Sequence, residues 1–319
     1  MADLVYPPVI LLARTVFAAL GLKFTIEGAE HIPRTGGAVL ASNHVGYLDF
    51  TFCGLAAHPS GRLVRFMAKD AVFRHHASGP FMRGMHHIPV DRDAGSAAFR
   101  DALRALKSGE VVGVFPEATI SRSFTIKPVK NGAVRMAAAT ATPVIPMAVW
   151  GSQRIFTKGR PKDFTHRGKA ITMAVGEPWI PGKREDLAEH TALLAQRMSE
   201  LLDHLQRTYP QSPAGPEDSW WLPVHLGGTA PTPAEAADLD AAEAAQRAAR
   251  RAERGGGEPG DVDLEAGDVD IEPADPDSRP GSDQPGSDQP GSDQPGSSDQ
   301  PGGSDQPGVR ADERDIADG

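Results

Sequence analysis

The stretch SAAFRDALRALKSGEVVGVFPEATIS, residues 96–121, contains a helix pattern, a strand pattern and a polar motif in direct succession. Residues 96–109 place Phe99, Ala102, Leu103 and Leu106 on one helical face, and Gly109 ends the pattern. The apolar run VVGVF is typical of a buried strand, and the polar residues follow it at once. Helix, buried strand and polar loop in this order indicate an α/β domain.

The same alternation extends over the first 208 residues. Further short apolar runs, several bounded by Gly or Pro, predict buried strands at 38–42, 64–68, 144–150 and 170–175. Helix patterns occur at 131–141 and 190–209. We therefore expect a single α/β domain with a largely parallel, helix-flanked sheet, a short apolar N-terminal helix and a disordered C-terminal tail. In such sheets, functional sites lie in loops beyond the carboxyl ends of the strands.

Charge divides the chain into two unlike parts. Residues 1–208 contain 26 Lys and Arg against 17 Asp and Glu, and residues 209–319 contain 7 against 25. The net charge of −9 therefore combines a basic domain at +9 with an acidic remainder at −18. A basic domain favours anionic partners such as phosphates, acidic lipid surfaces or nucleic acid. The single cysteine, Cys53, excludes an internal disulfide and is expected to be a small buried residue.

Three segments are predicted: an apolar N-terminal membrane-interfacial segment at 1–24, a domain at 25–210 and an acidic low-complexity tail at 211–319. The apolar run at 9–22 would form a helix about 21 Å long, too short for a hydrocarbon core of about 30 Å. A helix lying on one leaflet and an N-terminal core helix fit this run equally well.

The tail contains a predicted helix at 233–254, capped by Thr232 and Glu235. The helix lacks a substantial apolar face, so we expect it to be isolated rather than docked. Copies of PGSDQ at 280–294 cannot offset ordering entropy by burial. A partner-binding tether is one interpretation of the tail, but a dispensable linker is favoured, so that deletion of residues 212–319 would leave activity largely intact.

The segment NHVGYLDF, residues 43–50, places polar residues between two apolar runs. His44 and Asp49 are five residues apart, which does not put them on one helix face. A turn followed by a helix start at Asp49 can bring them together, with the carboxylate orienting a histidine that acts as a general base. Alternatively, Asp49 caps the following helix and His44 is a turn residue, and this spacing alone favours that structural interpretation.

A second polar group follows about seventy residues later. Glu117 lies in the loop after VVGVF, and Arg122, Lys127 and Lys130 precede a helix N-terminus near Asn131, an arrangement that attracts phosphate. For each cation taken alone, a solvated surface charge is the better interpretation. Arg92, at the end of GMHHIPVDR, is a further candidate for binding phosphate.

Together these motifs resemble the four blocks of the glycerolipid acyltransferases, the lysophosphatidic acid acyltransferase (PlsC-like) family. NHVGYLD resembles its NHx4D motif, and FPEATIS resembles its FPEGTRS block; these two are specific in combination. GMHHIPVDR and PVIPMAVWG are similar to its second and fourth blocks, which are weaker signals. The resemblance extends from about residue 20 to residue 205.

The resemblance implies direct acyl transfer from acyl-CoA or acyl carrier protein to the free hydroxyl of 1-acylglycerol 3-phosphate, giving phosphatidic acid, without a metal or a cofactor. It implies that His44 is the general base and Asp49 its orienting partner. It also implies that Arg92 binds the acceptor phosphate, that Glu117 helps to fix the acceptor, and that Asn43 contributes to substrate binding. The expected partners are a membrane surface, the lyso-lipid acceptor and the acyl donor, but no nucleic acid. The expected location is the cytoplasmic face of the cell membrane, as a peripheral or monotopic protein.

The third block departs from the family pattern. Ala118 replaces the usual glycine, and Ile120 replaces the usual arginine. Because isoleucine cannot bind phosphate, the contact is expected to move to Arg122, or else to Lys127 or Lys130.

Three other hypotheses remain. One is a transferase for a different lyso-lipid or polar acceptor, and a second is a non-catalytic lipid-binding relative. The third is a hydrolase with Ser42 or Ser121 as nucleophile, which the lack of a GxSxG-type elbow disfavours. The pairs His75–His76 and His86–His87 lack companion ligands at metal-site spacing.

Overall fold

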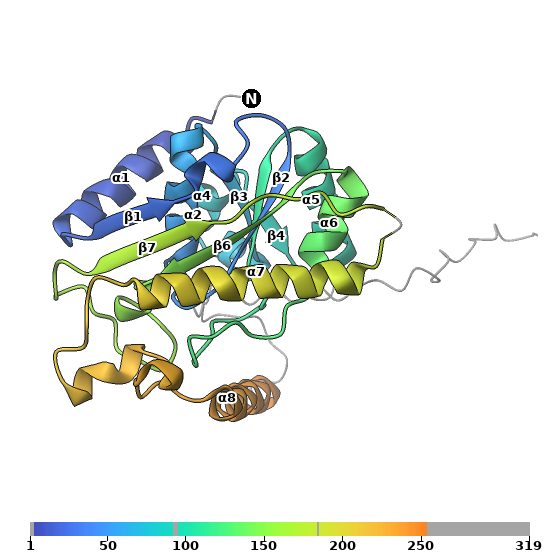
Figure 1. Cartoon of the computed structure of the whole chain (residues 1–319). Coiled ribbons are helices and arrows are strands. Elements are labelled where there is room, and N and C mark those ends of the chain that lie inside the picture. Colours follow the sequence, from blue (N-terminus) through green and yellow to red (C-terminus); the bar gives the residue numbers. More distant parts are fainter. Residues whose placement is uncertain (1–2, 92–94, 184, 254–319) are drawn as a thin grey trace, which may run out of the picture. The chain divides into compact units, whose positions relative to one another are not determined.

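The structure, a computed structural model, describes residues 3–91, 95–183 and 185–253. Its centre is a seven-stranded sheet with strand order β1-β7-β6-β2-β5-β3-β4 (Figure 1). Every neighbouring pair is parallel except β6 and β7. The strands are β1 Lys23–Glu27, β2 Ala38–Ser42, β3 Val64–Lys69, β4 Ile88–Val90, β5 Val111–Val114, β6 Val144–Trp150 and β7 Ala170–Val175. The predicted largely parallel α/β domain is confirmed.

Helices cover both faces of the sheet. The α-helices are α1 Tyr6–Ala19, α2 Asp49–Ala57, α3 Asp70–Arg74, α4 Gly79–Gly84, α5 Gly95–Lys107, α6 Gly132–Thr140, α7 Leu187–Arg207 and α8 Pro233–Glu253. Short 3₁₀ helices are η1 Ala29–His31, η2 His58–Ser60, η3 Ser152–Arg154, η4 Pro216–Trp221 and η5 Val224–Leu226. The predicted helices at 96–109, 131–141 and 190–209 correspond to α5, α6 and α7.

Alternating residues of β2 show how the sheet is buried. Leu40 packs with residues of α1 and α2 on one face, whereas Val39 and Ala41 pack with residues of α5, α6 and α7 on the other. Successive side chains of a strand point to opposite faces, so a strand covered on both sides consists of apolar residues throughout. This explains why the central strands are continuous apolar runs.

The N-terminal helix α1 combines the two interpretations that the sequence allows. Phe17 belongs to the core beside α2, and the hydroxyl of Tyr6 donates to the carbonyl of Val64 at 2.7 Å. The opposite side exposes Leu11 (68%) and Leu12 (65%). None of the helices in the described part of the chain is long and apolar enough to cross a bilayer. The helix therefore packs on the domain and presents leucines outward.

The structure corrects the predicted start of the tail. Trp221 in η4 is fully buried and joins a cluster with Trp150 of β6 and Leu205 of α7. Residues well beyond 211 thus belong to the core, so deletion of residues 212–319 would remove buried side chains of the domain as well as the tail. The PGSDQ repeats lie outside the described residues.

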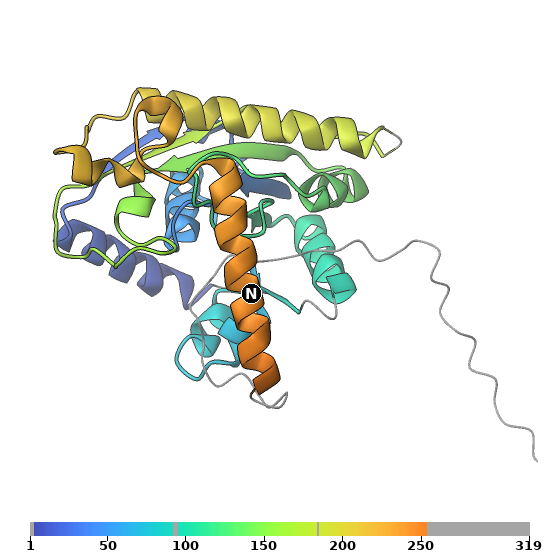
Figure 2. The same ribbon diagram turned by 90° about the horizontal axis from the view of Figure 1, so that it is seen from below.

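The predicted helix at 233–254 is present as α8, which lies outside the sheet and its covering helices (Figure 2). Thr232 and Glu235 form the expected capping box: the amide of Thr232 donates to the Glu235 carboxylate at 2.8 Å, and the Glu235 amide donates to Thr232 Oγ1 at 3.3 Å. The expectation that this helix is isolated is wrong, because its acidic residues pair with cations of the domain.

Candidate active site

The carboxyl ends of three adjacent parallel strands bring the polar motifs together. β2 lies between β5 and β6 in the sheet. His44 follows β2, Glu117 follows β5 and Ser152 follows β6. Because parallel strands end at the same edge, residues more than a hundred positions apart in sequence become neighbours.

His44 and Asp49 form a buried pair. Nδ1 of His44 lies 2.9 Å from Oδ2 of Asp49, and both residues are fully buried. The same carboxylate oxygen accepts the amides of Val45 at 2.7 Å and Gly46 at 2.8 Å. Asp49 is the first residue of α2, but its carboxylate turns back to the preceding turn rather than capping the helix. The structure therefore favours the histidine–carboxylate interpretation over the helix-cap interpretation.

Two further residues fix this pair. The hydroxyl of Ser152 donates to Oδ1 of Asp49, so both carboxylate oxygens have partners. The ring of Phe115 stacks on the His44 imidazole, with centroids 4.1 Å apart and an interplanar angle of 17°. No motif in the sequence points to Ser152. Its position directly after a predicted strand was a signal, but the strand order that places it beside Asp49 was not readable.

Asn43 and Glu117 bind backbone groups around the His44 turn. Nδ2 of the Asn43 side chain donates to the backbone carbonyl of Val149 at 3.0 Å, and its Oδ1 accepts a hydrogen bond from the backbone amide of Val149 at 2.7 Å. The Glu117 carboxylate accepts the amide of His44 at 3.0 Å and the amide of Lys127 at 2.8 Å. Asn43 thus joins the His44 turn to the backbone of β6, and its contact with a substrate stays a prediction. Glu117 joins the two motifs, and its contact with an acceptor stays a prediction.

Glu117 is also electrostatically unusual. Burial raises the pKa of the Glu117 carboxyl to about 8, while the hydrogen bonds from the Lys127 and His44 amides act in the opposite direction. A carboxyl group with a strongly raised pKa thus lies at the junction between the His44 turn and the loop that contains Arg122 and Lys127.

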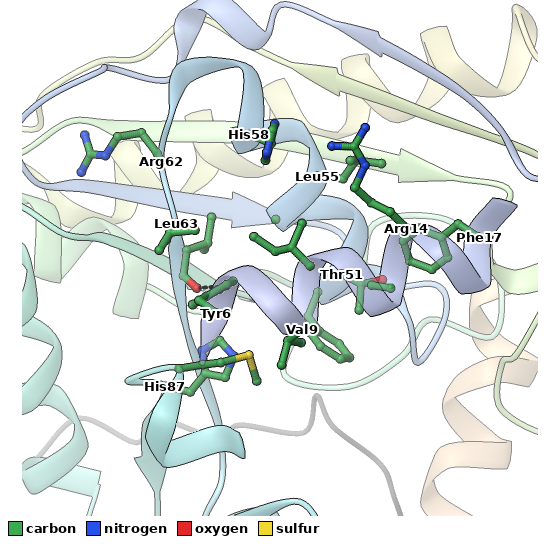
Figure 3. Close-up of a pocket in the computed structure, with 16 residues that line it drawn as sticks. Tyr6, Val9, Arg14, Phe17, Thr51, Leu55, His58, Arg62, Leu63 and His87 are labelled. Atoms are coloured by element: carbon green, nitrogen blue, oxygen red, sulfur yellow. Dashed lines mark hydrogen bonds between the residues drawn. The ribbon is translucent and has the colours of Figure 1, made fainter. Parts of the chain in front are cut away.

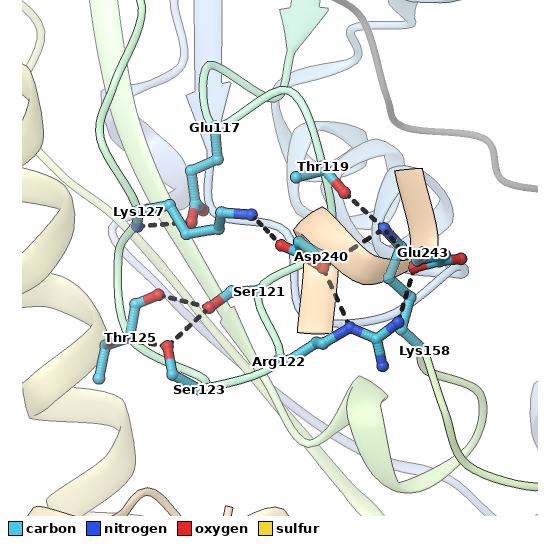
Figure 4. Close-up of polar contacts among 10 residues, drawn as sticks. All are labelled: Glu117, Thr119, Ser121, Arg122, Ser123, Thr125, Lys127, Lys158, Asp240 and Glu243. Carbon is cyan, nitrogen blue, oxygen red and sulfur yellow. Dashed lines mark hydrogen bonds and ion pairs between the residues drawn. The ribbon is translucent and has the colours of Figure 1, made fainter. Parts of the chain in front are cut away.

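Arg122 and Lys127 meet a third cation, Lys158, and we call these three residues the basic cluster (Figure 4). In this structure the cluster pairs with Asp240 and Glu243 of α8. Nε of Arg122 lies 3.0 Å from Oδ1 of Asp240, and Nη2 lies 2.7 Å from Oε2 of Glu243. Nζ of Lys127 lies 2.6 Å from Oδ2 of Asp240. Lys158 is not predictable as a member of the cluster, because it follows no motif that points to phosphate.

The two departures in the third block have distinct structural outcomes. Ala118 has a φ of 62°, the left-handed conformation for which glycine is suited, so the backbone keeps a glycine-type turn without glycine. The side chain of Ile120 is buried at 2% exposure and cannot serve an anionic ligand. The amide of Ser121 donates to the carbonyl of His44 at 2.7 Å, which places the next residue, Arg122, beside the His44 turn.

Lys130 and Arg92 are the other two predicted phosphate ligands. The backbone amide of Lys130 donates to the carbonyl of Pro116 at 2.9 Å, which ties Lys130 to the third block. Arg92 lies outside the described residues. Among the described residues, no group of three or more His, Cys, Asp or Glu side chains could hold a metal ion. Burial raises the pKa of the Cys53 thiol, which disfavours the nucleophilic thiolate.

Residues of α1 and α2 line an apolar pocket (Figure 3). Val9 and Phe17 line it from α1, and Phe50 and Leu55 line it from α2. Because Asp49 is the first residue of α2, the pocket wall begins one residue after the histidine–carboxylate pair.

Comparisons with known proteins agree with this arrangement. A family model described as Acyltransferase matches residues 23–150. A 1-acyl-sn-glycerol-3-phosphate acyltransferase of Bacillus subtilis is 32% identical over 193 residues, covering 57% of this chain and 89% of that protein. A chloroplastic 1-acyl-sn-glycerol-3-phosphate acyltransferase of Arabidopsis thaliana is 32% identical over 186 residues, covering 57% of this chain and 49% of that protein.

Among solved structures, the 1-acyl-sn-glycerophosphate acyltransferase PlsC from Thermotoga maritima has a similar fold. The TM-score is 0.54 at 21% sequence identity, and the match covers 64% of this chain and 81% of that chain. At this identity the likeness concerns the fold. The family match at 23–150 includes His44, Asp49 and Glu117 but ends before Lys158 and α8.

Proposed function

Because the chain belongs to the PlsC-like family of 1-acyl-sn-glycerol-3-phosphate acyltransferases, and is thus an acyltransferase, we propose that it makes phosphatidic acid from 1-acylglycerol 3-phosphate in phospholipid biosynthesis. Acyl-CoA or acyl carrier protein would supply the acyl chain, and no cofactor or metal would take part. The observation that carries the proposal is the buried contact between Nδ1 of His44 and Oδ2 of Asp49.

The proposed mechanism uses His44 as a general base. With Nδ1 held toward Asp49, Nε2 takes the proton of the acceptor hydroxyl as its oxygen attacks the thioester carbonyl. The tetrahedral intermediate then collapses, its carbon–sulfur bond breaks, and the departing thiolate receives the proton from the imidazolium. Asp49 holds the imidazole in the required tautomer and stabilises its positive charge, as the carboxylate does in a serine protease triad.

The acceptor phosphate would bind the basic cluster. Arg122 takes the place of the arginine that Ile120 cannot supply, and Lys127 lies beside it; Arg92 and Lys130 are further candidates. Replacing Arg122 by Ala should raise the KM for 1-acylglycerol 3-phosphate with little change in kcat, because a headgroup contact that is unaltered during the reaction contributes to binding alone. Wild-type kinetics in this variant would exclude Arg122 as the relocated contact.

We also propose that the protein works at a membrane surface, on the cytoplasmic face, as a peripheral or monotopic protein. The exposed Leu11 and Leu12 of α1 support this, since apolar residues on an exposed helix face favour an interfacial position. Leu11→Asp with Leu12→Asp should reduce co-sedimentation with anionic lipid vesicles. Replacing two exposed alanines of α8, Ala237 and Ala241, by Asp is the matched control. Equal co-sedimentation of both double variants and the wild type would contradict the membrane role of α1.

One assay tests the reaction. Purified protein in detergent is offered acyl-CoA or acyl carrier protein with 1-acylglycerol 3-phosphate, other lysophospholipids and monoacylglycerol. His44→Ala and Asp49→Asn should each lower kcat by about 10²- to 10⁴-fold, the typical contribution of a general base. His204→Ala, on the exposed side of α7, serves as the control and should keep wild-type activity.

The acceptor panel separates the proposal from its alternatives. The highest kcat/KM for a different lyso-lipid would favour the alternative acceptor, a possibility kept open by the burial of Ile120. Turnover with none of the donors and acceptors would favour a non-catalytic lipid-binding relative. Wild-type rates in both the His44 and Asp49 variants would refute the mechanism.

A further inference from the structure

The basic cluster is occupied by part of the chain itself. Besides the contacts of Arg122 and Lys127, Nζ of Lys158 lies 3.9 Å from Oδ1 of Asp240 and 3.7 Å from Oε2 of Glu243. Lys158 also donates to Oγ1 of Thr119, in the third block, at 2.7 Å (Figure 4). The two carboxylates of α8 thus face three cations that converge from two different loops.

Each of these cations is connected to the His44 turn. Arg122 follows Ser121, whose amide bonds the His44 carbonyl, and Lys158 follows Thr157, whose hydroxyl donates to the Val45 carbonyl at 2.7 Å. Lys127 is linked through Glu117, which accepts the amides of both Lys127 and His44. An anion bound to the cluster would therefore be held in a fixed position relative to the base.

The charge on α8 matches one class of ligand. Asp240 and Glu243 together carry about two negative charges, and a phosphomonoester carries about −1.5 to −2 at pH 7 with three strong acceptor oxygens. The Lys158 side chain is only 5% exposed, and a buried cation requires an anionic partner. If α8 detaches from the basic cluster, a phosphomonoester can replace both carboxylates, and the negative charge beside the three cations changes little.

The contact of α8 is suited to reversible release. Of the α8 side chains whose burial is described, Ala236 alone is buried, so ion pairs rather than apolar packing hold the helix. Such pairs are weak where they are partly exposed, and salt screens them. The preceding segment is different, because Trp221 and Ala230 belong to the core. The helix can therefore detach while its attachment to the domain stays folded.

From these contacts we propose that Lys158 completes a phosphomonoester site with Arg122 and Lys127, and that α8 is a cap whose Asp240 and Glu243 occupy the site when no acceptor is bound. The proposal rests on the proposed function for the identity of the natural ligand, a lyso-lipid with a terminal phosphate. Binding of that ligand displaces α8, so the cap and the acceptor compete for the same cations.

Hydrogen exchange of the full-length protein tests the competition without turnover. sn-Glycerol 3-phosphate should speed amide exchange in residues 233–253, because a helix released into water frays. Glycerol with sodium chloride at equal ionic strength is the control for salt screening. Inorganic phosphate and detergent-solubilised 1-acylglycerol 3-phosphate are tested separately. Release of α8 by both would show that a phosphate group is sufficient. Release by the lipid alone would show that the whole acceptor is required. Exchange in α8 that no phosphomonoester changes would overturn the proposal.

Two variants test the site by kinetics. Asp240→Asn with Glu243→Gln should lower the KM for 1-acylglycerol 3-phosphate by about three- to tenfold, since the competing cap is weakened. Asp238→Asn with Glu217→Gln removes two exposed carboxylates and should leave KM unchanged. Lys158→Met should raise this KM by about tenfold or more, as expected for loss of a charged hydrogen bond. Lys162→Met, in the same loop, should leave it unchanged.

The outcomes distinguish this proposal from the proposed function. Normal acyl transfer with a KM unaffected by the Asp240 and Glu243 changes would overturn the cap and leave the reaction in place. Release of α8 by glycerol 3-phosphate in a protein without transferase activity would support the anion site and refute the reaction. Unfolding temperatures confirm that each variant is folded, and Lys158→Arg, which keeps the charge, should restore most of the affinity lost in Lys158→Met.

Discussion

Ser152 donates its hydroxyl hydrogen to Oδ1 of Asp49, while Oδ2 of the same carboxylate pairs with Nδ1 of His44. Ser152 begins η3, directly beyond the carboxyl end of β6, whereas His44 follows β2. The Asp49 carboxylate is therefore held from both sides, by its own turn and by the neighbouring strand. Its orientation, and that of the imidazole, depends on the pairing of β2 with β6.

Ser152→Ala tests this dependence. The change leaves Oδ1 of a buried carboxylate without the hydroxyl donor, which costs about 1–3 kcal/mol. We expect kcat to fall about tenfold with KM nearly unchanged, because the serine positions Asp49 and does not touch the acceptor. Steady-state kinetics on the purified enzyme measure both quantities.

The matched control is Ser199→Ala, which removes a hydroxyl bonded to a backbone carbonyl on the exposed side of α7. It should keep wild-type kinetics. A kcat for Ser152→Ala equal to that of this control would show that the remaining donors to Asp49 suffice.

Much of the fold could be predicted because its central strands are buried on both faces. The predicted runs at 38–42 and 144–150 coincide with β2 and β6, since continuous apolar residues suit a strand between two layers of helices. β1 was missed, because as an edge strand it alternates exposed and half-buried residues. β4 was missed because it has only three residues, too few for a periodic pattern.

The site was predictable where its residues are close in sequence, and less so where strand order joins them. His44 and Asp49 lie within one turn, and the resemblance of NHVGYLD to a family motif predicted their contact, although their spacing alone favoured the helix cap. Ser152 and Lys158 reach the site through the placement of β6 beside β2, which local sequence does not encode. The docking of α8 was not predictable from a hydrophobic pattern, because this helix contacts the domain through carboxylates.

Glu117 should make stability depend on pH. Its pKa is about 8 in the folded protein, against an ordinary value of 4.5. The folded state therefore binds this proton more tightly than the unfolded state, so the stabilisation is complete below about pH 4.5 and is lost as pH rises through about 8. Glu117→Gln should be less stable than wild type at pH 5, and this difference should shrink towards pH 8.5.

Urea unfolding of both proteins across this pH range measures the effect. Glu189→Gln, at an exposed position of α7, is the control and should track the wild type at every pH. Wild-type and Glu117→Gln free energies of unfolding that stay parallel from pH 5 to 8.5 would contradict a raised pKa for Glu117.

Ala118 should tolerate glycine but not a β-branched residue. A left-handed conformation costs a non-glycine residue about 1–2 kcal/mol, and glycine relieves this while adding entropy to the unfolded chain. Ala118→Gly should thus change stability by less than about 1 kcal/mol and keep activity. Ala118→Val should lose more than about 2 kcal/mol, because strain and crowding at a buried position add.

Ala141 offers a matched comparison, since it has a φ of 52° at an exposed position after α6. Ala141→Val should show the cost of backbone strain without crowding, and should leave kcat unchanged. Urea unfolding compares the three variants with the wild type. Equal losses for valine at both positions would mean that crowding around Ala118 contributes nothing.

Trp221 should be essential for a stable domain although it lies in the segment predicted to be tail. Its ring is fully buried, and its centroid lies 5.6 Å from that of the Tyr209 ring. The guanidinium of Arg154 packs over the ring, 4.4 Å from its centroid. Trp221→Ala should lower the free energy of unfolding by about 3–5 kcal/mol, the usual cost of removing a buried aromatic side chain. Arg154 ends η3, the element that begins with Ser152. Activity should therefore fall as well, through a loosened Ser152–Asp49 contact.

The neighbouring Trp220 is the control for this change, because it is only partly buried and packs near Arg160 with the cation 4.9 Å from its ring centroid. Trp220→Ala should cost about 1 kcal/mol, as expected for a cation–π contact near the surface. Urea unfolding and kcat are measured for both. If Trp221→Ala were no less stable than Trp220→Ala, residues 216–221 would not belong to the core, and the domain would end near residue 210, where the sequence alone placed its boundary.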